Sequence, residues 1–216
     1  MIRTMIITVS TLVACLLAVA LAGPRAAAAA QTCPAEGFSN TTIRGGLTVA
    51  DGYCLLADVT VTGGVTVLGG GQVELESSRV AGGVRVRPGG EIEVGTSVFG
   101  GEATVTTIRG GLRLDHPVDW DIENARILGG LRIAGGVSPL AAPTLCGNTI
   151  AGGLRIRAVQ ATIAFVGAPG DAILGAGGAC EGNVIRGALT ILDSGLLHVE
   201  GNRVSGAVRI HRSRLT

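Results

Sequence analysis

Short stretches in which every second residue is apolar recur along this chain of 216 residues, and most of them follow a pair of glycines. The recurring phrase is Ile or Val, any residue, Gly-Gly, and then Leu-x-Ile or a close variant. Six segments carry both glycines and two later ones carry Gly-Ala: 43–49, 61–67, 80–86, 108–114, 127–133, 150–156, 185–191 and 204–210. In a β-strand, the first and third residues of Leu-x-Ile point to one side and the middle residue to the other. Each phrase therefore predicts a short strand with one buried side.

The spacing of these phrases predicts how the strands are arranged. Their first residues are separated by 18, 19, 28, 19, 23, 35 and 19 positions, so the basic period is about 19 residues. A period of this size is typical of a solenoid, in which each repeat forms one coil that stacks on its neighbours. We expect an all-β, single-stranded parallel β-helix of about eight or nine coils, with insertions near 87–107, 134–149 and 157–184.

Further alternating segments fill the rest of each coil: 59–61, 72–76, 91–94, 118–122 and 197–199. Two or three short strands per coil, stacked about 4.8 Å apart, would form parallel sheets around an apolar interior. We expect each glycine pair to form a corner, because glycine adopts positive φ without steric cost and lets stacked corners approach closely.

The first 30 residues differ from the repeats and resemble a secretory signal peptide. Arg3 precedes an almost wholly apolar run over residues 5–22, and small residues follow it. Cleavage after Ala22 or after Ala30 fits this pattern. We therefore expect a protein that is secreted from a bacterial cell or associated with its envelope, and that has no membrane segment after cleavage.

Two alternatives to cleavage stay open. The apolar run has about the length of a membrane span, so it can serve as an uncleaved anchor. Residues 12–15 resemble a lipobox, so lipidation of Cys15 is the other alternative. In every case we expect residues 31–216 to form one domain with an N-terminal cap at 31–42.

Four cysteines follow the leader, and an even number in an exported chain indicates two disulfides. Cys146 and Cys180 lie at nearly the same place in successive coils, ahead of the phrases at 150 and 185. Corresponding positions of stacked coils have the Cα separation of roughly 4.4–6.8 Å that a disulfide requires. We predict Cys146–Cys180, which leaves Cys33–Cys54 as the second pair. Because no Cys-x-x-Cys occurs, we expect neither a metal site nor a cofactor.

Asparagines stand at one more corresponding position. Asn148, Asn183 and Asn202 each lie two residues before the isoleucine or valine that opens a phrase. Since asparagine side chains bond to neighbouring backbone groups, we expect a stacked ladder rather than a ligand site.

The charges are nearly balanced, with 17 arginines, no lysine and 16 acidic residues. This balance and the small number of aromatic residues argue against nucleic acid as a partner. The outward position between the last two apolar residues of each phrase nevertheless holds arginine in five phrases and threonine in three; the arginines are Arg85, Arg113, Arg132, Arg155 and Arg209. Stacking would align them along one face.

This row has two interpretations. Guanidinium groups bind carboxylates and phosphates through paired hydrogen bonds, so an aligned row is a candidate surface for an anionic cell-envelope polymer. Alternatively, the arginines form weak, solvated ion pairs with Glu74, Glu76, Glu91 or Glu93 on neighbouring strands.

The pattern Gly-Asn-x-[Ile/Val]-x-Gly-[Gly/Ala]-[Leu/Val]-x-[Ile/Val] resembles the repeat of exported proteins of high-GC bacteria, and residues 33–67 resemble their opening segment. The resemblance covers residues 33–210 and implies a right-handed parallel β-helix, but the family has no assigned activity to transfer. A looser similarity is to bactofilins, which are polymer-forming β-helices of the cytoplasm or membrane and lack a signal peptide.

Parallel β-helices also include pectate lyases and polygalacturonases, but fold alone does not imply activity. The polygalacturonase motifs are missing here. The only concentration of polar side chains suited to acid–base or metal chemistry is Asp115, His116, Asp119 and Asp121. We expect Val118, Trp120 and Ile122 to point inward, which would leave Asp119 and Asp121 facing water.

These observations favour a non-enzymatic scaffold over a polysaccharide-acting enzyme, either pectate-lyase-like or a glycosidase, with a site at Asp115–Asp121. The scaffold would bind anionic polymer along the arginines or assemble end to end. The last coil of a solenoid exposes unpaired backbone, and the final phrase ends at Ile210, so that end is a candidate contact with a second copy.

Overall fold

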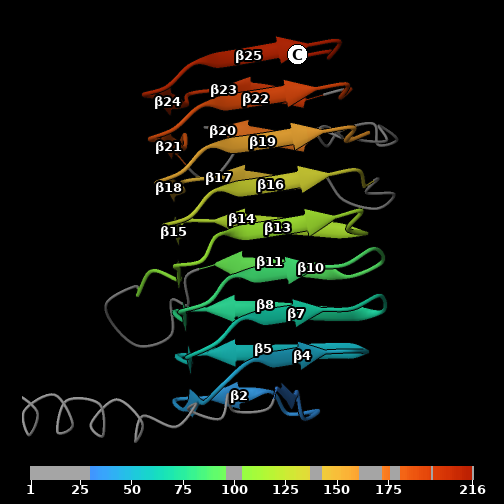
Figure 1. The fold of residues 1–216 in the computed structure, drawn as a ribbon, viewed down its shortest axis with the longest axis vertical. Helices are drawn as coiled ribbons and strands as arrows, with labels where there is room; N and C mark the ends of the chain where they lie inside the picture. Colours follow the sequence, from blue (N-terminus) through green and yellow to red (C-terminus); the bar gives the residue numbers. More distant parts are fainter. Residues whose placement is uncertain are drawn as a thin grey trace, which may run out of the picture.

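The computed structural model describes residues 30–95, 104–136, 143–160, 172–175, 181–195 and 197–215. These residues form a parallel β-solenoid of about eight turns with about 19 residues per turn, and none of them lies in a helix (Figure 1). The predicted fold class is confirmed. The leader falls outside the described residues except for Ala30, and no helix among the described residues is long and apolar enough to cross a membrane.

Each turn contributes one strand to each of three parallel sheets, here called A, B and C. Sheet A contains β1 (Gln31–Thr32), β4 (Leu47–Val49), β7 (Val65–Val67), β10 (Val84–Val86), β13 (Leu112–Asp115), β16 (Leu131–Ala134), β19 (Leu154–Arg157), β22 (Leu189–Leu192) and β25 (Val208–His211). Sheet B contains β2 (Phe38–Ser39), β5 (Gly52–Ala57), β8 (Gly71–Glu76), β11 (Glu91–Gly95), β14 (Asp119–Glu123), β17 (Thr144–Cys146), β20 (Ala172–Gly175) and β23 (Leu197–Glu200). Sheet C contains β3 (Thr42–Ile43), β6 (Thr60–Val61), β9 (Arg79–Val80), β12 (Thr107–Ile108), β15 (Arg126–Ile127), β18 (Thr149–Ile150), β21 (Val184–Ile185) and β24 (Arg203–Val204).

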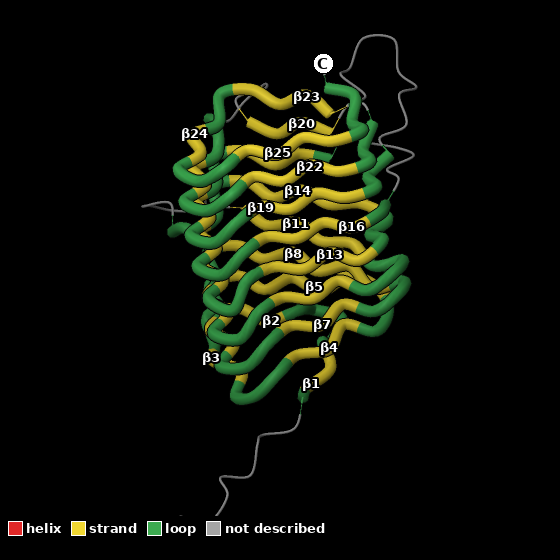
Figure 2. The backbone as a smooth tube through the Cα atoms, turned by 45° about the horizontal axis from the view of Figure 1, so that its top comes forward, coloured by secondary structure: helices red, strands yellow, loops and turns green. Residues whose placement is uncertain are grey.

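Sheets A and B lie back to back, with their strands running in opposite directions, and sheet C closes one side (Figures 1 and 2). Alternation along each strand separates the inside from the outside. In β16, Leu131 and Ile133 are buried in the interior while Arg132 between them is exposed. Repeating this arrangement in successive coils places one continuous apolar core between the three sheets.

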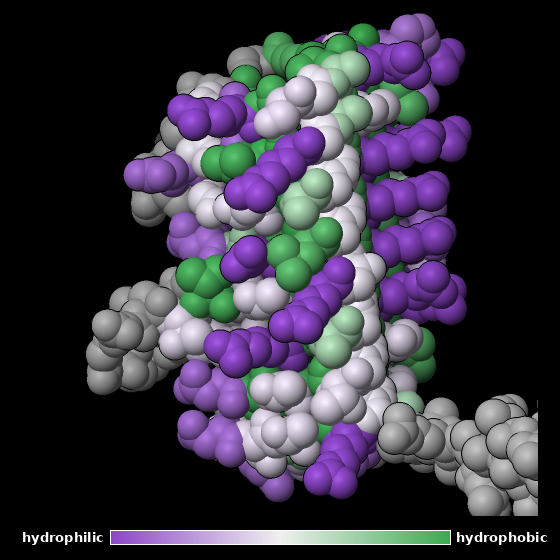
Figure 3. Space-filling view, turned by 60° about the vertical axis from the view of Figure 1, so that its left-hand side comes forward, coloured by the Kyte–Doolittle hydropathy of each residue, from purple (hydrophilic) through white to green (hydrophobic). Residues whose placement is uncertain are grey.

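The corner from sheet C to sheet A has three residues in all eight turns, and its glycines appear as a pale stripe in Figure 3. From Gly63 onward, the first glycine of each corner has no room for a side chain: a Cβ on Gly110 would lie 1.6 Å from the carbonyl oxygen of Gly82. The second glycine has more space, and alanine stands there at 188 and 207. Among these described pairs only Gly45 and Gly111 have positive φ, so close approach of stacked backbones, and not φ, explains the other glycines.

A polar ladder stabilises the corner from sheet B to sheet C. The side-chain nitrogen Nδ2 of Asn148 donates to Oδ1 of Asn183 over 2.9 Å, and Nδ2 of Asn183 donates to Oδ1 of Asn202 over the same distance. Asn148 and Asn183 are buried. The predicted asparagine ladder is therefore confirmed, and Ser78 and Thr106 occupy the same position in earlier turns, where Ser78 N donates to Thr106 Oγ1.

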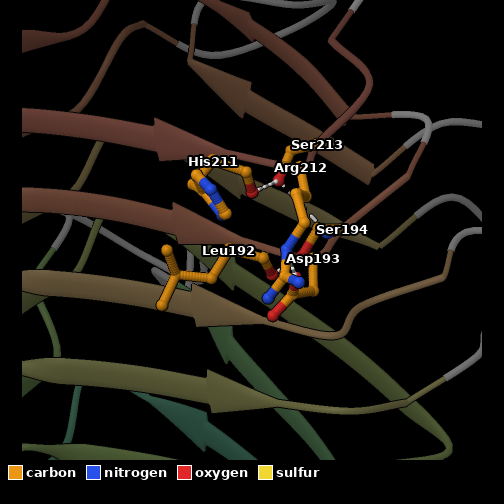
Figure 4. A network of polar contacts seen from close by, with 6 residues as sticks. All are labelled: Leu192, Asp193, Ser194, His211, Arg212 and Ser213. Carbon is orange, nitrogen blue, oxygen red and sulfur yellow. Dashed lines mark hydrogen bonds and ion pairs between the residues drawn. The ribbon is translucent and has the colours of Figure 1, made fainter.

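A second ladder lies at the corner from sheet A to sheet B near the last turns (Figure 4). Ser194 N donates to Ser213 Oγ over 3.1 Å, and each serine hydroxyl also donates to the carbonyl oxygen two residues earlier. Beside them, Nε of Arg212 lies 2.8 Å from Oδ1 of Asp193. These polar contacts have a structural role, because they satisfy backbone groups where the chain leaves the sheet.

The N-terminal end is tied to the solenoid by β1, which pairs with β4, and by the predicted disulfide Cys33–Cys54, whose Cα atoms are 6.0 Å apart. Cys146 is also disulfide-bonded. Its predicted partner, Cys180, lies outside the described residues, as do parts of the three predicted insertions.

Candidate functional site

The outward arginines of sheet A stand in register. Arg85 pairs with Arg113, Arg113 with Arg132, and Arg132 with Arg155, each on the next strand of the sheet. Thr190 follows, and then Arg209. Neighbouring strands of a sheet lie about 4.8 Å apart. The predicted alignment is therefore present, and we call these five arginines the arginine row.

A shallow groove of about 690 Å³ runs along the arginine row over six consecutive turns of the solenoid, from β7 to β22. One side of the groove consists of the glycines of the corners and Ala188, and the other side consists of outward side chains of sheet A, most of which are arginines. Figure 3 shows the hydrophilic side chains of sheet A projecting in a column beside the pale stripe of the corners. An extended ligand can therefore lie along the row in contact with both.

No acidic partner of the arginine row lies among the residues that the structure describes. Among the described residues, none of its five guanidinium groups forms an ion pair, and the four glutamates that the sequence suggested as partners lie on β8 and β11 of sheet B. That pairing is therefore wrong, because sheet B presents its outer surface on the other side of the solenoid (Figure 1). Two like charges about 4 Å apart in water repel by roughly 1 kcal/mol, so a row without counter-charges favours binding of anions.

Sheet B carries the opposite charge. The outward positions of β8, β11 and β14 hold seven carboxylates, here called the carboxylate face: Glu74, Glu76, Glu91, Glu93, Asp119, Asp121 and Glu123. Glu74, Glu93 and Asp121 form one in-register line, and Glu91 pairs with Asp119 beside it. The described strands of sheet B contain no arginine. Although the net charge of the chain is close to zero, the outer surfaces of sheets A and B thus carry opposite charges.

Burial and neighbouring charges raise the pKa of two residues of the carboxylate face, Asp121 and Glu93. The pKa of Asp121 is raised to about 7, first by burial and then by the charges of Glu123, Glu93 and Asp119. The pKa of Glu93 is also raised, again first by burial and then by neighbouring carboxylates. Within the described part of the chain, Oδ1 of Asp121 is buried without a hydrogen-bond partner.

The only tyrosine lies at the edge of the carboxylate face. The Tyr53 hydroxyl donates to Oε2 of Glu74. Burial, followed by this hydrogen bond and the charge of Glu74, raises the pKa of Tyr53 to about 12. The carboxylates of sheet B therefore add to the effect of burial on this phenol.

The polar segment at 115–121 is divided between two sheets. Asp115 ends β13 in sheet A, and exposed His116 occupies the following turn with φ 48°, its Nδ1 3.2 Å from Oδ1 of Asp115. Asp119 and Asp121 lie on β14 in sheet B. Among the described residues, no group of three or more His, Cys, Asp or Glu side chains is arranged to hold a metal ion.

One orientation in this segment differs from the expectation. Trp120 and Ile122 point inward as predicted, but Val118 is 39% exposed, and Pro117 is buried instead. The reason is the turn at His116: β14 begins only at Asp119, so the alternation of that strand does not extend back to Val118.

Sheet C carries further arginines that the sequence reasoning did not single out. Arg79, Arg126 and Arg203 occupy its outward row, where threonine or valine separates them in the intervening turns. The sequence could have revealed this row, because each of these arginines stands directly before the isoleucine or valine that opens a phrase. Because these arginines are interrupted, sheet A alone presents four arginines on consecutive strands.

Comparison of the chain with models of protein families, with curated proteins and with solved structures finds no match.

Proposed function

We propose that this protein is a non-enzymatic scaffold of the bacterial cell envelope that binds a linear anionic polymer along the arginine row. One observation carries the proposal: Arg85, Arg113, Arg132 and Arg155 stand on consecutive strands without carboxylate partners among the described residues. The leader-like first 30 residues and the resemblance of the repeat to exported β-helix proteins support a place outside the cytoplasm.

The shape of the site supports a polymer over a small ligand. A single anion meets one or two guanidinium groups, whereas a chain with repeated carboxylates or phosphates meets several in succession. The groove along the glycine corners gives the body of such a chain a place to lie beside the arginines.

Binding of polygalacturonate and of polyphosphate by the mature protein, measured by calorimetry at low and high salt, tests this proposal. The test variant is R113Q/R132Q/R155Q. Its matched control is R79Q/R126Q/R203Q, which removes the same charge from sheet C. We expect the test variant to bind about tenfold more weakly than the wild type, since three exposed contacts of about 0.5 kcal/mol each add to a factor of this size.

The control variant should retain most of the affinity, and high salt should weaken binding of the wild type. An equal loss in both variants would show attraction to net charge without a defined site. Absence of binding to both polymers at low salt would contradict the proposal.

A second candidate, assembly through the solenoid ends, rests on a different observation. Val208 and Ile210 continue the inward rows of sheet A at β25 but are 55% and 44% exposed, whereas Leu47 and Val49 on β4, next to β1 at the other end, are 1% exposed. Exposed apolar side chains beside a strand edge are typical contact surfaces. V208T/I210T should abolish any association that depends on this end and leave polymer binding unchanged.

A further inference from the structure

We propose that the carboxylate face of one molecule binds the arginine row of a second copy, so that molecules associate face to face into an open stack. This inference does not depend on polymer binding. It concerns the surface of sheet B, for which the proposed function gives no role.

The first argument is charge complementarity between two flat faces. The strands of sheets A and C that the structure describes contain nine arginines and one aspartate, whereas β8, β11 and β14 of sheet B present seven carboxylates. Arginine and carboxylate form paired, charge-assisted hydrogen bonds. Each face therefore presents the chemical groups that the other one binds.

The second argument is the spacing of the two rows. Arg85, Arg113 and Arg132 are in register on β10, β13 and β16, and Glu74, Glu93 and Asp121 are in register on β8, β11 and β14. Both rows follow the rise of the same solenoid, so their spacings match without any adjustment. A second copy can then place three carboxylates against three arginines at once, which an arbitrary acidic protein would not do.

The third argument is the state of the carboxylates in the single molecule. Oδ1 of Asp121 is buried without a hydrogen-bond partner in the described part of the chain, and neighbouring carboxylates and burial raise the pKa of Asp121 and Glu93. Tyr53, Glu123 and Asp119 surround the same line, and Thr144 on the next strand bonds Asp121. A partner that supplies guanidinium groups would relieve the repulsion between these carboxylates.

The arrangement of the two faces determines the form of the assembly. Sheets A and B are back to back, so the two binding surfaces point away from each other (Figures 1 and 2). A contact between different surfaces of identical molecules propagates unless a rotation closes a ring. We therefore expect stacks of variable length, and any polymer on the arginine row would compete with them.

Sedimentation velocity of the mature protein over a range of concentrations, at low and high salt, tests the inference. The wild type should form species of increasing size at low salt and return to monomers at high salt. Two variants each retain a single binding face: E74Q/E93Q/D121N keeps the arginine row, and R113Q/R132Q/R155Q keeps the carboxylate face. Alone, each should remain monomeric. Mixed, they should form a one-to-one complex that does not grow.

A matched control, E36Q/D58N/E181Q, removes the same charge at exposed positions outside the carboxylate face and should associate like the wild type. A wild type that stays monomeric at low salt, or a mixture that forms no complex, overturns the inference. Polygalacturonate binding of E74Q/E93Q/D121N separates the two proposals. If this variant binds polygalacturonate but the wild type stays monomeric at low salt, the proposed function stands alone. If the two single-face variants form the mixed complex but E74Q/E93Q/D121N binds no polygalacturonate, the inference stands alone.

Discussion

Sheets A and B share an interior but present opposite charges to the solvent. In β16 the alternation is Leu131, Arg132, Ile133, and in β11 it is Ile92, Glu93, Val94, with the apolar members buried in both. The inward positions of the two sheets pack into one core, so the same kinds of side chain serve in both. The outward positions meet only neighbours on the same sheet, and there the two sheets differ.

The difference shows that adjacent residues of one strand have separate roles. The inward residues determine whether the coils stack, and the outward residues determine what the stacked surface attracts. A strand therefore tolerates replacement of its outward residue with little change in stability. The following predictions test this division, from the largest expected effect to the smallest.

Leu131→Ala should lower the free energy of unfolding by about 2–5 kcal/mol, because it leaves a cavity in the core. For a domain of this size, each kcal/mol corresponds to a fall in Tm of about 2–4 °C. The adjacent exposed substitution Arg132→Gln should change the stability by less than about 0.5 kcal/mol. Thermal unfolding followed by circular dichroism compares them, and similar losses in both variants would contradict the division.

Gly110→Ala should destabilise the protein by about 3 kcal/mol, because the new Cβ overlaps the backbone of Gly82 at the corner that leads into sheet A. Gly153→Ala provides the control. Its Cβ would lie 3.0 Å from the carbonyl oxygen of Ala188, and alanine already stands at that place in the next turn, so we expect a loss below about 1 kcal/mol. Chemical denaturation measures both, and equal losses would mean that close stacking does not explain the glycines.

Asp121→Asn should stabilise the protein at about pH 8 and leave it nearly unchanged at about pH 4. The folded-state pKa of Asp121 is about 7, above its ordinary value of 3.8, so its contribution is fully present below about pH 4 and is lost as the pH rises through about 7. Because the carboxyl is partly solvated, we expect a gain of only about 1 kcal/mol. Thermal unfolding at both pH values measures it, and a gain at pH 4 as large as at pH 8 would contradict the assignment.

Glu74→Gln should lower the pKa of Tyr53 from about 12 towards 10, because it removes the carboxylate that accepts the phenol hydrogen bond. Arg132→Gln, on the opposite sheet, should leave this pKa unchanged. Tyr53 is the only tyrosine, so ultraviolet absorbance during alkaline titration reports it alone. A shift of similar size in both variants would mean that the potentials of the two faces are not separate.

Much of this fold can be predicted from the sequence, because each repeat contains the pattern that determines how its strand pairs with the next one. The position of Leu-x-Ile after the glycines determines which residues face inward, and stacking of the phrases then aligns Arg113 with Arg132 and Arg155, although the second interval is four residues longer than the first. The sequence also predicted Cys33–Cys54 and the ladder from Asn148 to Asn202.

The rest depends on three-dimensional relations between segments that do not repeat. Whether Glu74 faces the arginines or lies on another sheet depends on how the chain turns between sheets A and B, and those turns vary in sequence. The orientation of Val118 depends on where the turn at His116 ends. Both are determined by turn geometry, which the strand alternation does not encode.

The invariant corner between sheets C and A also affects how such a protein can change in evolution or by engineering. That corner has three residues in every turn, whereas the connection from sheet A to sheet B ranges from two residues between β4 and β5 to 14 between β19 and β20. New segments can therefore enter on the edges opposite the glycine stripe without disturbing the stack. Foreign peptides grafted there would be displayed at regular heights, and duplication of a whole coil would lengthen the display by one step.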